Sequence, residues 1–123
     1  MPGDESAEVS VEQLQMCSRF NVPPVAFRYD KNVGVARNVA VKPDLWPLNG
    51  LRHSPETHTT GWFIWAGDDL PQDADFFVPM HARHIAEIRP ICLPYLALPP
   101  GWRFLIAPGH EDVWYDESLL NLD

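Results

Sequence analysis

Thirteen prolines are spread along the whole chain, and they constrain its fold more than any other feature of the sequence. Proline normally makes up roughly 5% of residues, about half of its share here. Because proline lacks a backbone N–H and fixes one backbone angle, it interrupts helices and central strands. The prolines separate apolar segments from one another, so we expect short elements, many turns and no long helix.

The 123 residues are enough for one domain with one hydrophobic core. We expect residues 1–10 to form a flexible N-terminus and residues 11–123 to form the domain. The pattern of short apolar segments and turns predicts an α+β fold. We expect a mainly antiparallel sheet of four to six strands with two or three short helices.

The first half of the chain predicts a helix and a hairpin, followed by an irregular stretch. Apolar residues within 11–20 recur at helical spacing. Alternating apolar residues at 25–29 and 33–41, joined by a turn at 30–32, predict two paired strands. Residues 43–60 show no period, so we expect a long loop of a kind that often binds partners.

The second half predicts strands around a short helical region. A continuous apolar run at 61–67 predicts a central strand covered on both faces. Residues 76–78 predict a short strand, and Pro79 suits the first turn of a helix with Ile88 on its apolar face. Pro90 ends that helix and opens another short one.

The last third of the chain is the expected structural centre. Residues 102–115 predict two strands joined by a Pro-Gly turn. Asp116 stands at the cap position of a short terminal helix. Trp102 and Trp114 would then lie on neighbouring strands, and we expect both in the core.

The net charge of −8 is concentrated after Gly67, where ten carboxylates face three arginines. The sharpest charge feature is the acidic segment formed by Asp68, Asp69, Asp73 and Asp75. Paired aspartates can bind divalent cations, but the calcium-loop pattern ending in a glutamate is absent. An acidic surface speeds association with a basic partner and repels nucleic acid, although it can also serve solubility alone.

The cysteines and the N-terminus predict the cellular compartment. Cys17 and Cys92 match no metal-binding or redox spacing, so we expect two buried free thiols in a reducing compartment. The acidic N-terminus lacks the apolar core of a signal peptide, and no apolar stretch has the length of a membrane span. We therefore expect a cytoplasmic protein that contacts no membrane.

Few residues suggest catalysis or metal binding. His81 and His84 are close in sequence and could share a metal ion, but a zinc site needs a third protein ligand. A catalytic pair of Cys92 and His84 would need an accessible thiolate, and the apolar neighbours of Cys92 indicate burial. A small metal-binding protein or hydrolase using His81 and His84 is one alternative to a binding protein without a cofactor, and a structural or adaptor subunit of a larger assembly is another.

The five tryptophans would fill a small core quickly. Because both faces of the 61–67 run are aromatic, we expect some aromatic surface to stay exposed, where it can serve binding. Trp46, in the expected 43–60 loop, is the candidate aromatic anchor. The tryptophans are Trp46, Trp62, Trp65, Trp102 and Trp114.

Several segments between residues 60 and 120 together resemble one protein family. They are GWFIW at 61–65, FF at 76–77, the stretch from His81 to His84, LALPPGWRF at 96–104 and EDVWYD at 111–116. The chain resembles the Imm33-like immunity-protein domain of bacterial polymorphic toxin and type VI secretion systems. The last two segments are the most specific to it, and the part before Thr60 matches no family that we can name.

The resemblance implies a non-enzymatic protein that binds and neutralises a cognate toxin, delivered by a contact-dependent or type VI-like route. It supplies no catalytic residues. The acidic composition fits one-to-one capture of a basic toxin, for example a nuclease, and leaves a homodimer open. The candidate toxin contacts, chosen from charge clusters and loops, are Asp68, Asp69, Asp73, Asp75, Glu111, Asp112 and Trp46.

Overall fold

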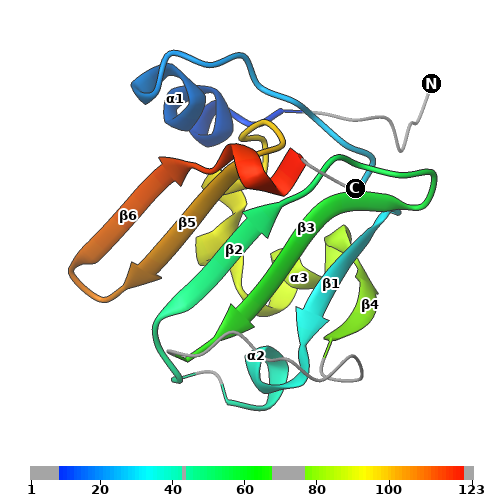
Figure 1. The fold of residues 1–123 in the computed structure, drawn as a ribbon. Helices are drawn as coiled ribbons and strands as arrows, with labels where there is room; N and C mark the ends of the chain where they lie inside the picture. Colours follow the sequence, from blue (N-terminus) through cyan, green and yellow to red (C-terminus); the bar gives the residue numbers. More distant parts are fainter. Residues whose placement is uncertain (1–8, 43, 68–76, 121–123) are drawn as a thin grey trace.

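A six-stranded sheet is the centre of the computed structural model, which describes residues 9–42, 44–67 and 77–120 (Figure 1). Its strands are β1 (Asn32–Ala36), β2 (Leu48–Arg52), β3 (Thr59–Ala66), β4 (Phe77–His81), β5 (Trp102–Ala107) and β6 (His110–Tyr115). They lie in the order β4-β1-β3-β2-β5-β6. Among them β1 and β3 run parallel, and the other neighbouring pairs are antiparallel. The expected α+β fold is confirmed.

The described helices are α1 (Val11–Arg19), α2 (Arg37–Val41), α3 (Ala82–Ile88) and the 3₁₀ helices η1 (Pro90–Tyr95) and η2 (Glu117–Leu120). In the view of Figure 1, α3 and η1 lie behind the sheet, and α1 packs against η1. On the opposite side η2 lies at the end of the sheet where β2 finishes. Most of the described helices therefore lie on one face of the sheet. We call the other the open face, because Phe63 is exposed on it, although Leu51 and Trp65 on the same face are buried. None of these helices is long and apolar enough to cross a membrane.

Side-chain hydrogen bonds fix where α1 begins and what it packs against. Ser10 Oγ accepts a hydrogen bond from the Gln13 N–H at 3.1 Å, and Gln13 Oε1 accepts one from the Ser10 N–H at 3.0 Å. This reciprocal pair is a capping box. The Gln13 amide also donates to the Leu93 carbonyl at 2.9 Å and so ties α1 to η1. The helix predicted within 11–20 is confirmed.

The predicted long loop at 43–60 is wrong, because β2 lies within it, between β3 and β5. The Asn49-Gly50 pair has the composition of a turn, which is why no strand was expected there. Gly50 is needed because a Cβ atom at this position would lie 2.2 Å from the ring of Phe104. The Asn49 amide donates to the Gly67 carbonyl at 2.9 Å, so this buried polar group has a partner.

The predicted hairpin of 25–29 and 33–41 is also wrong. Residues 25–29 form no strand, and β1 ends at Ala36, where α2 begins. A single backbone hydrogen bond of 2.8 Å links the Val25 N–H to the Ala97 carbonyl. The strands that do pair with β1 are β3 and β4, which are distant in sequence. A local alternation of apolar residues cannot reveal such partners.

The helix predicted to begin at Pro79 begins later, because Pro79 belongs to β4. Among the described strands β4 is an edge strand paired only with β1, and an edge strand tolerates a residue without an N–H donor. α3 buries Ala82 and Ile85. Ile88, which we expected on the apolar face, is 40% exposed.

The other predictions for the second half are mostly confirmed. β3 is the expected central strand, but the expected cover on both faces is wrong at Phe63, which is 36% exposed. η1 begins at Pro90, and β5 pairs with β6 across the expected turn. The Asp116 carboxylate accepts a hydrogen bond from the Ser118 N–H at 3.1 Å and caps η2. Trp102 is partly buried against the core. Trp114 is 38% exposed, so its predicted place in the core is wrong.

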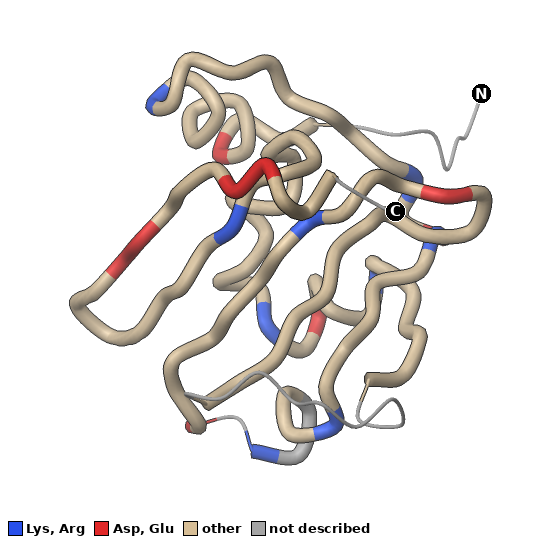
Figure 2. Tube along the Cα trace, viewed as in Figure 1, with Lys and Arg blue, Asp and Glu red and all other residues tan. Residues whose placement is uncertain are grey.

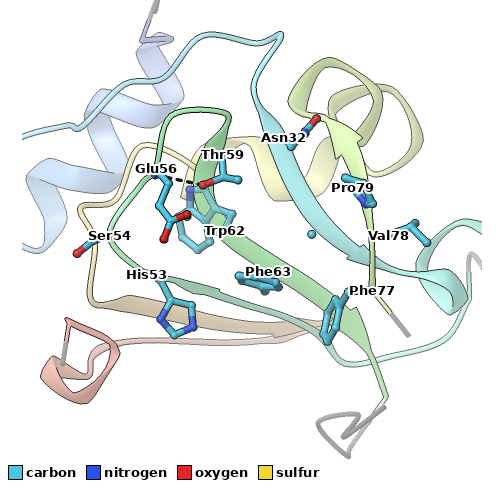
Figure 3. A pocket seen from close by; sticks show the side chains of 12 residues that line it. Asn32, His53, Ser54, Glu56, Thr59, Trp62, Phe63, Phe77, Val78 and Pro79 are labelled. Carbon is cyan, nitrogen blue, oxygen red and sulfur yellow. Dashed lines mark hydrogen bonds between the residues drawn. The ribbon is translucent and has the colours of Figure 1, made fainter. Parts of the chain in front are cut away.

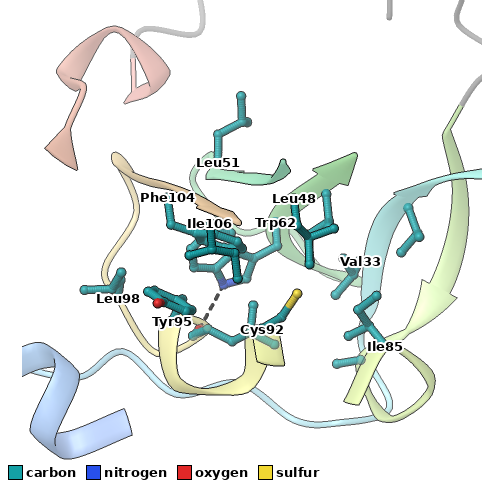
Figure 4. Packing of buried hydrophobic residues seen from close by; sticks show 14 of the residues in the cluster. Val33, Leu48, Leu51, Trp62, Ile85, Cys92, Tyr95, Leu98, Phe104 and Ile106 are labelled. Carbon is teal, nitrogen blue, oxygen red and sulfur yellow. Dashed lines mark hydrogen bonds between the residues drawn. The ribbon is translucent and has the colours of Figure 1, made fainter. Parts of the chain in front are cut away.

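The hydrophobic core fills the space between the sheet and the helices behind it (Figure 4). Trp62 is the largest fully buried side chain, and its indole N–H donates to the Leu96 carbonyl at 2.8 Å. Cys17 and Cys92 are buried and free, as the sequence predicts. The aromatic face of β3 that points this way therefore serves the fold.

Arg52 is a buried cation at the end of β2. Its guanidinium donates to the carbonyl groups of Val25, Thr60 and Leu98 at 2.9, 2.9 and 2.8 Å. Burial lowers the pKa of Arg52 to about 10, so the side chain stays charged at neutral pH. None of the ion pairs in the described part of the chain includes Arg52, and backbone carbonyl dipoles take the place of a carboxylate.

Candidate binding face

The strand β3 divides its side chains between the core and the open face of the sheet. Trp62 and Ile64 are buried in the core, and Phe63 points the other way because successive residues of a strand alternate. Phe63 is 36% exposed although β3 is a central strand. Its ring lies over Gly34 of β1, where a Cβ atom would come 2.6 Å from the ring. Gly34 thus lets a large aromatic side chain lie close against the sheet.

Three further rings join Phe63 to form a row across the sheet, which we call the aromatic row: His53, Phe63, Phe77 and Trp65. The rings of His53 and Phe63 meet edge to face at 5.6 Å between centroids, and those of Phe63 and Phe77 at 5.5 Å. Trp65 meets Phe77 in the same manner at 6.4 Å. Edge-to-face packing holds each ring in place. Phe63 is the exposed member of this row, whereas Trp65 is buried at its end.

A cavity of about 540 Å³ opens beside the aromatic row (Figure 3). Its walls come from β1, β3, β4 and the connection between β2 and β3. Phe63 lies at its centre in Figure 3, with His53 on one side and Phe77 on the other. A cavity of this volume has the size of a small-ligand site, and it is large enough to receive a side chain of a partner.

Glu56 and His53 give this cavity its polar character. The Glu56 carboxylate points into the cavity on the side of His53 (Figure 3). Within the described part of the chain, no ion pair includes Glu56. His53 Nδ1 lies 3.0 Å from the Leu119 carbonyl oxygen. Because a carbonyl oxygen only accepts, Nδ1 is the donor in this contact.

A second hollow of about 450 Å³ adjoins the first at Asn32. It is polar, and its charged groups have partners within the chain. Arg28 pairs with Asp30 at 2.9 Å, and the Lys31 ammonium donates to the Thr57 carbonyl. The first cavity, whose carboxylate lacks such a partner among the described residues, is the stronger candidate for binding.

Acidic residues are scattered over the described surface, on β6, on η2 and in the connection between β2 and β3 (Figure 2). The described residues hold equal numbers of carboxylates and of Lys and Arg side chains, so the net charge of −8 belongs to residues 1–8, 68–76 and 121–123. The predicted contacts in the acidic segment lie outside the described residues: Asp68, Asp69, Asp73 and Asp75. The segment joins β3 to β4, the strands that carry Phe63 and Phe77.

Glu111 and Asp112 are neighbours in sequence that point to opposite faces of β6. The Glu111 carboxylate accepts hydrogen bonds from Arg19, at 2.7 Å, and from the Tyr95 hydroxyl, and these bonds lower the pKa of Glu111. Asp112 faces the open side, with His110 Nε2 at 2.9 Å. Glu111 is thus bound within the chain, whereas Asp112 is accessible.

Trp46 lies in the connection between α2 and β2. It is partly buried against the core, and the Arg89 guanidinium lies 5.2 Å from the centre of its ring. The role of Trp46 as an aromatic anchor for the toxin stays a prediction. The exposed part of the ring stays available to a partner.

The histidines and cysteines do not assemble into a reactive site in the described residues. His81 ends β4, and its ring lies 6.4 Å from that of His84 in α3. Over the described ranges, no three His, Cys, Asp or Glu residues group to hold a metal ion. Burial raises the pKa of the Cys92 thiol to about 12, so it is protonated at neutral pH and unsuited to act as a nucleophile with His84.

The sequence pattern indicates the exposed aromatic ring of this face but not the residues around it. The aromatic residues on both sides of the 61–67 run predict an exposed ring, and Phe63 is that ring. Gly34 lies on β1, whereas His53 and Glu56 lie together in the connection between β2 and β3, and none of the three carries a local signal. They meet only because β1 pairs with β3 in parallel and β2 lies on the other side of β3.

Comparison with protein-family models gives one finding that bears on this face. The model of the Imm33-like domain matches residues 12–116, which include all six strands of the described sheet. No curated protein and no solved structure matches the chain. The family match covers the segment before Thr60, for which the sequence alone suggested no relative.

Proposed function

Because the chain belongs to the Imm33-like domain family, we propose that it is an immunity protein that binds a cognate bacterial toxin one-to-one and neutralises it. Immunity domains are in general not enzymes, and the toxin is the partner that such a domain implies. We further propose that the toxin is delivered by a type VI-like route and that the immunity protein meets it in the cytoplasm.

The open face of the sheet is the proposed contact surface, and exposed Phe63 is the observation that carries this assignment. A ring exposed on a central strand, held edge to face by His53 and Phe77, loses little conformational freedom when a partner covers it. Aromatic side chains of this kind are frequent hot spots in protein interfaces.

Charge supports the same location. The acidic segment of Asp68, Asp69, Asp73 and Asp75 connects the two strands that carry Phe63 and Phe77. Carboxylates beside an apolar contact raise the rate of association with a basic partner. Asp112 on β6 can add to this attraction. Glu111 should contribute less to this attraction than Asp112 does, because its charge is already paired with Arg19.

A protection assay tests the proposed function. The candidate toxin is the C-terminal domain of a large secreted protein encoded directly upstream, and cells that produce this domain should survive only with the immunity protein. Phe63→Glu should abolish protection and weaken binding by about 100-fold or more, because it places a charge at a hot spot. Leu14→Glu is the matched control, since Leu14 is 48% exposed on α1, away from the open face.

Thermal unfolding of both variants separates lost binding from lost folding. If Phe63→Glu stays folded and protects cells as the wild type does, the open face is not the contact surface. If the wild type neither binds nor protects against the upstream toxin domain, the immunity assignment itself is wrong for this pair.

A further inference from the structure

We propose that the cavity beside Phe63 receives one arginine side chain of the toxin, with the guanidinium stacked on the Phe63 ring and hydrogen-bonded to the Glu56 carboxylate. This inference rests on the proposed function, because the arginine belongs to the toxin.

The floor of the cavity suits a planar cation. One side of the Phe63 ring lies against Gly34, and the other side stays open to solvent. His53 and Phe77 meet this ring at nearly right angles, and Phe63 stays 36% exposed between them. A guanidinium group stacks on such a ring and gains a cation–π attraction that an apolar side chain lacks.

The wall of the cavity offers hydrogen-bond acceptors. The Glu56 carboxylate points inward, and the Glu56 N–H donates to Thr59 Oγ1 at 3.2 Å, which steadies the connection that carries it. His53, which donates through Nδ1 to the Leu119 carbonyl, lines the same wall. A guanidinium group has five N–H donors and no acceptor, which complements a wall of acceptors.

The charge of the cavity favours a cationic occupant. Glu56 is the one Asp or Glu among the described lining residues, which include no Lys or Arg. A carboxylate of the partner would be repelled there. An apolar or aromatic side chain would fill the space but leave the Glu56 carboxylate desolvated without a partner, which is costly. Lysine would supply the charge, but its ammonium cannot stack on the ring or bind a carboxylate in a fork.

A small probe tests the cavity without the toxin. N-acetylarginine amide, titrated into the ¹⁵N-labelled protein, should shift the backbone amide signals of Gly34, His53 and Phe63 in a saturable manner, with a Kd on the order of millimolar. N-acetylcitrulline amide has nearly the same shape without the charge. It should bind about tenfold more weakly or not at all.

Variants of one carboxylate decide between this site and a general acidic surface. Glu56→Gln should remove the preference for arginine over citrulline, whereas Glu87→Gln on α3, behind the sheet, should leave it unchanged. Equal binding of the two probes, equal effects of the two variants or shifts spread over the whole surface would each overturn the arginine site.

The toxin assay keeps this inference separate from the proposed function. In the complex, Glu56→Gln should weaken toxin binding by about tenfold while Phe63→Glu abolishes it. If Glu56→Gln binds the toxin as tightly as the wild type does, the arginine site is wrong and the immunity assignment stands. Probe binding without toxin binding would overturn the immunity assignment for this toxin.

Discussion

The ring of Phe63 lies over Gly34, so close that a Cβ atom on Gly34 would come 2.6 Å from it. Gly34→Ala must therefore displace the Phe63 ring or the strand beneath it. We expect a loss of about 1–3 kcal/mol in the free energy of unfolding, measured by urea denaturation, and a parallel loss of toxin affinity.

A double-mutant cycle checks the cause of that loss. With Phe63→Ala in place, the added methyl group of Gly34→Ala meets no ring, so the second change should cost little further stability. Additive losses in the cycle would show that the alanine strains β1 for another reason. The same cycle measured with toxin reports whether the position of the ring matters for binding.

Charge reversal in the acidic segment tests electrostatic capture. Asp68→Lys with Asp69→Lys should lower the association rate with the toxin by about tenfold at low salt and flatten its dependence on salt. Glu12→Lys with Glu87→Lys changes the net charge equally, on α1 and α3. Stopped-flow measurements give the association rate of each variant with the toxin. They separate the effect of which carboxylates are replaced from the effect of net charge. Equal rates for the two variants would assign the effect to net charge alone.

The elements found from sequence and those missed differ in where their partners lie. Capping by Ser10, the turn between β5 and β6 and the continuous apolar run of β3 are local features, so the pattern predicts them. β2 was missed because Asn49 and Gly50 have the composition of a turn, although neighbouring side chains require them in the strand.

The candidate site was less predictable than the fold. Its aromatic content was visible in the 61–67 run, but the cavity depends on the parallel pairing of β1 with β3, which leaves no periodic signal in either strand. Trp114 was expected in the core because tryptophan is large and apolar. It is exposed instead, because it lies on the edge strand β6.

We expect the protein to lose stability in acid, because the Glu111 carboxylate becomes protonated there. Hydrogen bonds from Arg19 and then Tyr95 lower the pKa of Glu111 below its usual value of 4.5. A depressed carboxyl pKa stabilises the fold above the unfolded value, and this stability is lost as the pH falls through the folded value. Tm should therefore drop between pH 6 and pH 3, and Glu111→Gln should reduce that drop. Glu117→Gln, on η2, is the control and should leave the drop as it is in the wild type.

Replacing Arg52 should lower the free energy of unfolding more than replacing Arg103 does. Arg103 pairs with Asp116 at 3.2 Å near the surface, so Arg103→Met should cost no more than about 1 kcal/mol. Arg52→Met removes the donors to three buried carbonyl groups, those of Val25, Thr60 and Leu98. Each unpaired carbonyl costs about 1 kcal/mol or more, partly offset because a buried charge is also removed.

We therefore expect Arg52→Met to lower the free energy of unfolding by about 2–4 kcal/mol in urea denaturation at neutral pH, several times the loss for Arg103→Met. The difference is the test, because both variants delete the same charge and keep a side chain of similar length. If the two losses were equal, the hydrogen bonds from Arg52 to the three carbonyl groups would stabilise the fold no more than a surface ion pair does. A larger loss for Arg52→Met would identify the guanidinium as the group that joins the end of β2 to the segments at Val25 and Leu98.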